Sequence, residues 1–170
     1  IDTNFLSVLS AVKQNQTCDL IVTGYFKVEN DKKEVNFWRG GRRFFKEDIC
    51  TYLQQYCVAP NKNYAFVHVW SKFYSRELIE VNNIRFNEGM KLHEDIEFNL
   101  RFLSQTRSLS YLNTSYYSHI ISNGSASFLP LRDVDAVFSI TVVVRALSVY
   151  FSRRNIGFGV VRLLTRHLLW

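Results

Sequence analysis

The sequence predicts an α/β fold, and three observations support that class. Short β-branched apolar runs alternate with stretches in which apolar residues recur at helical spacing. Of the 170 residues, 47% are apolar and 15% aromatic, enough for a real hydrophobic core in one domain. Only seven glycines and two prolines occur, which excludes disorder, collagen-like repeats and linker-rich scaffolds.

The first part of the chain predicts a helix followed by a pair of strands. Asp2 can cap a helix in which Phe5 and Leu9 lie at helical spacing. The next apolar run is β-branched and too short for a helix, so it predicts a buried strand. In order, we expect a helix over 2–12, a buried strand over 19–26, a charged turn over 29–33, a returning strand over 34–38 and a basic glycine loop over 39–43.

The rest of the chain continues the alternation of helices and strands. Ser75 is a favoured N-cap residue, and Leu92, Ile96, Leu100 and Leu103 form one helical stripe. The expected elements are a helix over 46–58 stopped by Pro60, a strand over 65–70, a helix over 75–81, a helix over 93–103, strands over 108–112 and 115–121, a turn over 123–125, and two helices over 130–170 that break near 155–157.

The excess of positive charge lies in the C-terminal segment. Residues 131–170 hold six arginines and two aspartates, so they carry +4 of the net +6. A solvated helix face explains this pattern, and so does an anionic membrane surface, because apolar residues interleave with Arg153, Arg154, Arg162 and Arg166 as on an interfacial helix. A helix packed on another part of the protein is the structural alternative. No RNA-reading motif or zinc spacing supports a nucleic-acid partner.

The cysteines and the hydropathy pattern limit the cellular locations that suit the protein. The three cysteines, Cys18, Cys50 and Cys57, form no CxxC pair, which favours a reducing compartment. The apolar run 136–144 is far shorter than the roughly 20 residues that span a bilayer. We therefore expect a soluble or peripheral protein.

A cluster of carboxylates marks the start of the helix at 93–103. Glu94 and Asp95 lie in its first turn, where the helix dipole stabilises anions, and Glu97 is spaced for a surface ion pair with Arg101. These roles are purely structural. The functional alternative is that the loop containing Gly89 brings two adjacent carboxylates to a rigid helix end, where a general base can reach a substrate hydroxyl.

Four blocks of sequence carry a resemblance to a known family. Residues 70–79 read W-S-K-F-Y-S-R-E-L-I, residues 83–89 read N-I-R-F-N-E-G, residues 94–99 read E-D-I-E-F-N, and residues 116–117 read Y-Y. In this order they resemble the second half of bacterial family 2 glycosyltransferases. The resemblance implies a GT-A-like mixed sheet flanked by helices, with an acceptor-binding and catalytic-base half at 1–130 and a basic helical extension at 131–170.

The same resemblance extends to the start of the chain. Residues 1–6, I-D-T-N-F-L, are similar to the segment that follows the metal-binding D-x-D motif of these enzymes. We therefore expect the chain to begin just after that motif, without the nucleotide-binding half. A non-catalytic binding module or an inactive remnant is the alternative function.

The resemblance implies roles for individual residues. Asp95 is expected to be the general base of an inverting transfer from a nucleotide-sugar donor, with Glu94 orienting the acceptor or sharing the proton. A divalent cation, Mg²⁺ or Mn²⁺, is expected at the diphosphate, held mainly by the D-x-D. His119 is a candidate for a late metal or phosphate contact, or an ordinary strand histidine.

The acceptor site is assigned in the same way. Trp70, Lys72, His93 and Gly89 are expected to line it, although Trp70 also suits a core position and His93 an exposed helix start. Residues 105–107 do not match the Q-x-x-R-W motif of processive enzymes, which favours single-sugar transfer. We expect a saccharide or lipid-linked saccharide acceptor in cell-surface polysaccharide biosynthesis, in the cytoplasm and peripheral on the inner face of the membrane.

Overall fold

The computed structural model describes residues 5–7, 10, 18–30, 32–36, 43–45, 67–121 and 133–152. The chain divides into two compact units, each assembled from segments that are distant in sequence. The first, called the sheet unit, comprises Ile1–Phe45, Trp70–Ser75 and Arg107–Pro130. The second, called the helical unit, comprises Lys46–Val69, Arg76–Thr106 and Leu131–Trp170.

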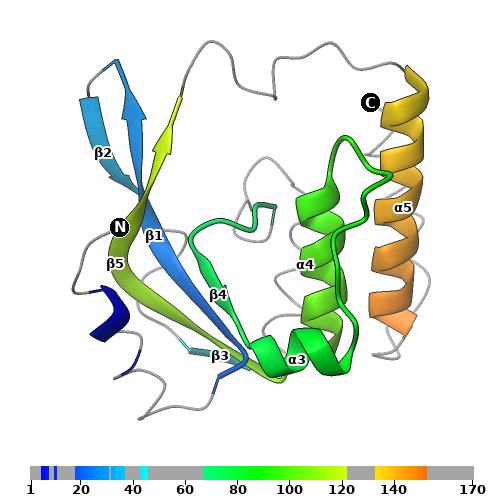
Figure 1. The fold of residues 1–170 in the computed structure, drawn as a ribbon, viewed down its shortest axis with the longest axis horizontal. Helices are drawn as coiled ribbons and strands as arrows, with labels where there is room; N and C mark the ends of the chain where they lie inside the picture. Colours follow the sequence, from blue (N-terminus) through cyan, green and yellow to red (C-terminus); the bar gives the residue numbers. More distant parts are fainter. Residues whose placement is uncertain are drawn as a thin grey trace. The chain divides into compact units, whose positions relative to one another are not determined.

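The sheet unit is a mixed five-stranded sheet organised around strand β1 (Leu20–Glu29) (Figure 1). One edge of β1 pairs antiparallel with β4 (Lys72–Tyr74) and, further along, with β2 (Lys32–Asn36). The other edge pairs in parallel with the long strand β5 (Ser108–Ile120), which pairs antiparallel with β3 (Arg43–Phe45). The predicted buried strand is confirmed. The returning strand expected at 34–38 is present but already starts at Lys32, so the turn expected at 29–33 is too long, because Glu29 and Lys32 pair with each other.

The core of the sheet unit lies at the start of β1 and β5. Leu20, Val22 and Leu109 are fully buried there. Phe5, from the helical residues near the N-terminus, packs its ring against Phe73. Burying these side chains supplies the unit with its main hydrophobic stabilisation.

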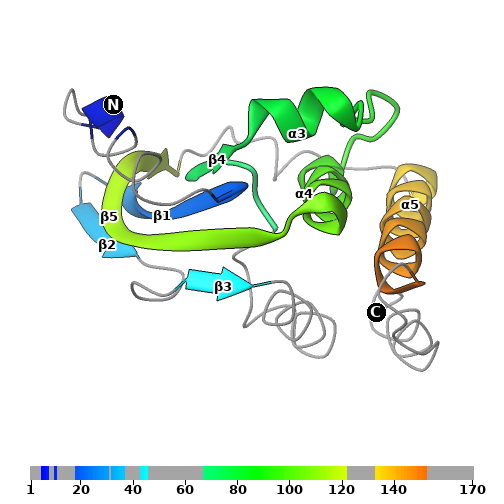
Figure 2. The same ribbon diagram turned by 90° about the horizontal axis from the view of Figure 1, so that it is seen from below.

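Strand β5 replaces the two separate strands expected at 108–112 and 115–121. Leu112 lies opposite Thr23, but Ser115 lies opposite the next residue, Gly24, so the pairing continues through an irregularity. A bulge accommodates the extra residues without ending the ladder with β1, and it increases the local bend. Figure 2 shows the resulting curve of β5.

The strand expected at 65–70 is wrong where it can be compared, because residues 67–70 form a turn. The His68 carbonyl accepts a hydrogen bond from the Asn99 side chain, and the Val69 N–H donates to Asp95. These side chains replace the neighbouring strand that a β-strand needs. Ser71 then adopts a left-handed conformation with φ 61°, and β4 starts only after it.

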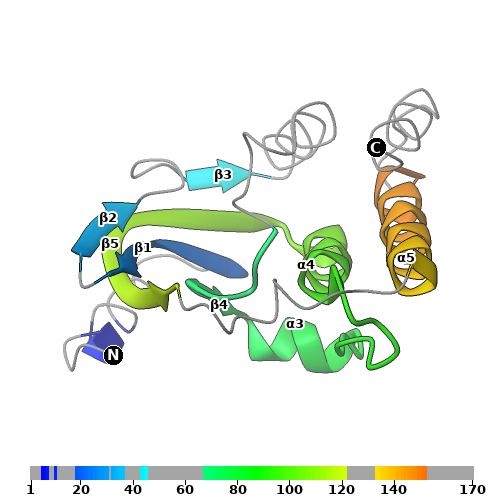
Figure 3. The same cartoon turned by 90° about the horizontal axis from the view of Figure 1, so that it is seen from above.

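The helical unit contains α3 (Arg76–Val81), α4 (Glu94–Gln105) and α5 (Asp133–Ser152). In Figures 2 and 3, α4 and α5 are both seen nearly end-on, while α3 is seen lengthwise beside α4. The predicted apolar stripe of α4 is buried at Ile96, Leu100 and Leu103. Lys91 pairs with Asp135 at 3.2 Å, which links the loop before α4 to the first turn of α5.

Several predicted elements lie outside the described residues. They are most of the helix over 2–12, the helix over 46–58, the turn over 123–125, the second tail helix over 153–170 and, except for Arg43, the loop over 39–43. Arg43 was expected in that loop but is the first residue of β3, because it pairs with Ser110 of β5. The boundary predicted at residue 130 stays a prediction. No helix within the described ranges is both long and apolar enough to cross a membrane.

Candidate functional site

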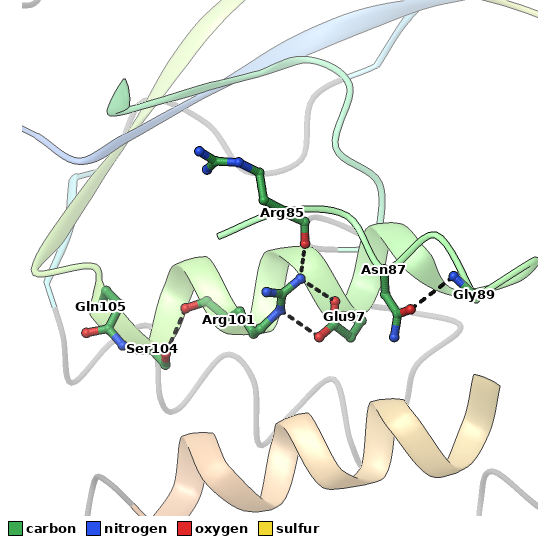
Figure 4. A network of polar contacts seen from close by, with 7 residues as sticks. All are labelled: Arg85, Asn87, Gly89, Glu97, Arg101, Ser104 and Gln105. Carbon is green, nitrogen blue, oxygen red and sulfur yellow. Dashed lines mark hydrogen bonds and ion pairs between the residues drawn. The ribbon is translucent and has the colours of Figure 1, made fainter. Parts of the chain in front are cut away.

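The loop before α4 is anchored at both ends by buried side chains. Ile84 and Met90 are buried, and the Met90 N–H donates to the Asn87 carbonyl at 3.0 Å to close a turn. Within that turn the Asn87 side-chain oxygen accepts a hydrogen bond from the exposed Gly89 N–H at 3.1 Å (Figure 4). The loop therefore brings the chain to α4 with a defined course.

His93 is the N-cap of α4 and has an unusual backbone. Its φ of 61° and ψ of 15° lie in the left-handed region, and its carbonyl accepts the Glu97 N–H at 3.1 Å. Burial lowers the pKa of the imidazole below its ordinary value, an effect that neighbouring Glu94 partly opposes. The ring is therefore held mainly in its neutral form beside the acidic pair.

Asp95 binds the turn at 67–70 through the backbone. Its Oδ2 accepts the Val69 N–H at 3.1 Å, and four residues later the Asn99 Nδ2 donates to the His68 carbonyl at 3.1 Å. Residues at this spacing share one helix face. The Asp95 carboxylate therefore has a fixed orientation at the start of α4, where the helix dipole favours a negative charge.

Glu94 differs from Asp95 in its contacts. Its side chain is half-buried, and it makes no hydrogen bond or ion pair with any residue that the structure describes. The acidic pair thus combines one positioned carboxylate with one that has no such restraint. This difference suits a base next to a group that adapts to a ligand.

Glu97 has a purely structural environment. Its side chain is only 9% exposed and forms a two-point ion pair with Arg101, with Nε–Oε1 at 2.6 Å and Nη2–Oε2 at 2.9 Å (Figure 4). The Arg101 guanidinium also donates to the Arg85 carbonyl in the preceding loop. The predicted pair is present, but its expected surface location is wrong, because the helix buries this face.

A second cluster, in the sheet unit, gathers three rings around Trp70. The indole lies nearly parallel to Tyr117, at 5.2 Å and 12°, and to His119, at 5.0 Å and 10°. Tyr25 meets it edge-on at 4.8 Å, and burial raises the pKa of that phenol. We call Tyr25, Trp70, Tyr117 and His119 the aromatic cluster.

Hydrogen bonds at Ser71 hold Trp70 in place. The Ser71 hydroxyl donates to the Gly24 carbonyl at 2.6 Å, and its own carbonyl accepts the Thr23 N–H at 2.9 Å. Lys72 follows and is only 7% exposed, with its ammonium 3.4 Å from the Trp70 carbonyl. The buried corner at 70–72 is thus fastened to β1.

The structure places the predicted site residues in two groups. The start of α4 and its loop bring together Gly89, His93, Glu94 and Asp95, while the sheet unit brings together Trp70, Lys72 and His119. Among the described residues, no group of three or more His, Cys, Asp or Glu side chains is arranged to hold a metal ion. The metal contact of His119 stays a prediction.

Three residues that contribute to these groups, Asn99, Tyr117 and Tyr25, had no role predicted from the sequence. Asn99 lies four residues after Asp95, a spacing that could have revealed their shared helix face. Tyr117 and His119 alternate on one strand, which indicated a shared sheet face. Nothing in the sequence indicated that Tyr25 and Trp70 would join them.

Comparisons with known proteins agree on one class. No family model matches the chain. Over 135 residues it is 27% identical to the cholesterol galactosyltransferase of Borreliella burgdorferi (strain ATCC 35210 / DSM 4680 / CIP 102532 / B31), covering 75% of this chain and 36% of that protein. The resemblance to glycosyltransferases is confirmed.

Solved structures show the same fold. S. aureus TarS 1-349 in complex with UDP-GlcNAc superposes with a TM-score of 0.59 and 17% identity, covering 93% of this chain and 48% of that one. The complex of the same protein with UDP superposes with a TM-score of 0.51 and 16% identity, covering 91% of this chain and 45% of that one. The GT-A-like α/β class is therefore confirmed, and the chain spans half or less of the length of these proteins.

Proposed function

We propose that the chain is the acceptor-side and catalytic-base part of an inverting, non-processive glycosyltransferase. The donor is a nucleotide sugar, and the acceptor is a saccharide or lipid-linked saccharide of cell-surface polysaccharide biosynthesis. Similarity to a galactosyltransferase and to the fold of a UDP-GlcNAc complex supports this class. The observation that carries it is the oriented Asp95 carboxylate within the E-D-I-E-F-N block.

The reaction assigns a role to each residue at the start of α4. Asp95 accepts the proton of the acceptor hydroxyl while that oxygen forms a bond to the anomeric carbon. The bond from this carbon to the diphosphate breaks on the opposite face, and the nucleoside diphosphate leaves with the electron pair. Glu94 orients the acceptor or shares the proton, and His93 and Gly89 line the acceptor site.

The sheet unit contributes acceptor contacts in this proposal. Trp70 lines the acceptor site as part of the aromatic cluster. Lys72 is expected to meet phosphate, although its ammonium is directed to a backbone carbonyl. Because the described residues hold no metal-binding group, we derive no step through Mg²⁺ or Mn²⁺. The cation stays a prediction tied to the D-x-D motif of the family.

The proposal includes a location. The interleaved arginine and apolar residues of 153–170 support peripheral binding to an anionic membrane from the cytoplasmic side. Co-sedimentation of the full-length protein with anionic and neutral vesicles tests this part by itself. Preferential pelleting with anionic vesicles is expected, and equal pelleting with both contradicts it.

A transfer assay tests the proposed function. The full-length protein is incubated with UDP-galactose or UDP-GlcNAc and a panel of saccharide acceptors, and the product anomer is identified by proton NMR. We expect one sugar to be added to a given acceptor with inverted anomeric configuration. Retention of configuration contradicts the inverting mechanism, and absence of transfer with every donor and acceptor supports the non-catalytic alternative.

A further inference from the structure

The aromatic cluster shares its face of the sheet with a set of polar side chains. Paired residues on neighbouring strands project to the same face of a sheet. On β2, β1 and β5 the registers define two complete rows and part of a third on this face. The rows are Asn36, Tyr25 and Tyr117, then Glu34, Lys27 and His119, then Lys32 and Glu29.

The irregularity in β5 creates this arrangement. Ser115 pairs with Gly24, and Tyr117 pairs with the next residue, Tyr25, so one additional β5 residue is inserted between these pairs. A one-residue insertion moves every following side chain to the opposite face. Without it, Tyr117 and His119 would lie on the other face from Tyr25. The bulge therefore aligns the rings with Trp70 and the polar rows.

Exposure within the cluster is uneven. Trp70 is half-buried, and its ring faces other rings of the same unit, whereas 37% of the Tyr117 surface is exposed. The indole therefore supports the cluster from behind, and Tyr117 offers the accessible ring. An exposed ring that packing holds rigidly provides contact area at little cost in conformational entropy.

A hollow lies beside the rings on the same hairpin face. It has a volume of about 210 Å³ and is lined by Lys27, Glu29, Asn30, Lys32 and Glu34. Lys27 lies opposite His119 in the sheet and pairs with Glu29 at 2.7 Å. Positively and negatively charged side chains, which can donate and accept hydrogen bonds, thus line the hollow. Its volume is smaller than the roughly 300 Å³ at which sites for drug-sized ligands begin, and it suits one small polar ring.

The opposite face of the same strands has a different character. Phe26, Val28, Val35 and Ile120 lie there, and Ile120 is 68% exposed. The opposite face also carries Ser118 and Lys33, whose ammonium lies 3.8 Å from the centre of the Phe26 ring, but the two charged rows and the aromatic cluster lie together on the first face. A sugar ring has the matching chemistry, since its C–H face packs on an aromatic ring and its hydroxyls both donate and accept hydrogen bonds.

We infer that this face is a saccharide-binding surface, with the Tyr117 ring as the stacking platform and the side chains of the hollow as hydrogen-bonding partners. The inference deepens the proposed function, on which it rests for the acceptor class, by assigning a saccharide subsite to the β1–β2–β5 face. Tyr25, Trp70 and His119 are positioning residues that hold the platform.

Binding to an array of defined oligosaccharides, measured in the full-length protein without nucleotide sugar, tests the inference. Tyr117→Ala is expected to weaken binding of the captured saccharide about tenfold, and Tyr117→Phe to retain it because the ring remains. Ile120→Ala is the matched control, since it truncates a more exposed side chain on the opposite face of the same strand. Its affinity is expected to equal that of the wild type.

A variant in the hollow keeps the inference testable if Tyr117→Ala does not fold. Lys27→Met is expected to weaken saccharide binding several-fold, because it removes a hydrogen-bond donor from the lining of the hollow at a half-exposed strand position. The inference would be overturned by unchanged saccharide affinity in folded Tyr117→Ala or in Lys27→Met. It would also be overturned if the protein captured no oligosaccharide, or if UDP directly displaced the bound saccharide. Displacement by UDP would show that the rings hold a nucleobase instead.

The binding assay separates this inference from the proposed function. If the protein binds a saccharide through Tyr117 but transfers no sugar, the saccharide-binding surface is supported and the proposed transferase function is contradicted. If the protein transfers a sugar but its saccharide binding does not depend on Tyr117, the transferase function is supported and the saccharide-binding surface is contradicted.

Discussion

Two of the three carboxylates of helix α4, those of Asp95 and Glu97, lie in opposite situations. Glu97 is almost fully buried and forms a two-point ion pair with Arg101. Asp95, on another face of the helix, is half-buried and accepts a hydrogen bond from the neutral backbone of Val69. The same helix therefore uses one acid to fix its packing and presents the other in a defined direction.

The comparison shows why carboxylates cannot be assigned by type alone. A carboxylate that is buried and held at two points by a guanidinium fixes the packing of its helix and is out of reach of a substrate. The Asp95 carboxylate, in contrast, takes its direction from the Val69 N–H and is only half-buried. Three substitutions and one kinetic measurement test this distinction.

The largest effect on stability is expected at the Glu97–Arg101 pair. Arg101→Leu leaves Glu97 buried without its countercharge, and we expect a loss of about 3 kcal/mol in the free energy of unfolding, since the guanidinium is one-third exposed. Urea unfolding measures it. Arg107→Leu, at an exposed arginine, is the control and should change stability by less than about 0.5 kcal/mol. Equal losses in both variants would contradict the structural role of Glu97.

A smaller effect is expected on the Asp95 face. Asn99→Ala removes the hydrogen bond to the His68 carbonyl and should cost about 1.5 kcal/mol, because a fully buried side chain loses this hydrogen bond. Gln105→Ala, at the end of the same helix, is the matched control. Turnover should fall in Asn99→Ala beyond any loss of folded protein, since the turn that orients Asp95 is loosened. Unaltered turnover per folded molecule would show that the turn at 67–70 does not contribute to catalysis.

The smallest effect concerns pH. Burial lowers the pKa of His93 from 6.5 in the folded state, so the unfolded chain binds more protons as the pH falls below 6.5. Stability from this residue is complete above 6.5 and is lost on acidification through the folded-state pKa. His93→Asn, which tolerates the left-handed backbone, should lose less stability between pH 7.5 and 5.5 than the wild type. Equal losses in chemical denaturation would exclude His93 as the source.

Local patterns were sufficient for most of the described elements. The N-cap residue Ser75 located α3, helical spacing located α4, and the β-branched run located β1. The failures share a physical cause. At 67–70 an apolar run became a turn because side chains of α4 took its backbone hydrogen bonds, a contact between residues about 30 positions apart. Hydrophobicity alone does not report such contacts.

The site shows the same division. Adjacent acids and their helix start were readable from the spacing of 94–99. The aromatic cluster was not, because it depends on a register change in β5 and on a left-handed Ser71 that no local propensity indicates. Both features change the direction in which side chains point, and tertiary contacts cause them. The strict alternation of side chains along a strand therefore does not predict them.

The most direct test of the account is the turnover of Asp95→Asn in the full-length enzyme, measured beside Glu94→Gln and an exposed-loop control, Glu88→Gln. The amide preserves the shape of Asp95 but cannot serve as the base. We expect kcat to fall by a factor of about 10² to 10⁴ in Asp95→Asn, with donor affinity nearly unchanged, a smaller fall in Glu94→Gln, and no change in Glu88→Gln. Near-normal turnover in Asp95→Asn, or a larger loss in Glu94→Gln, would contradict the assignment of Asp95 as the base.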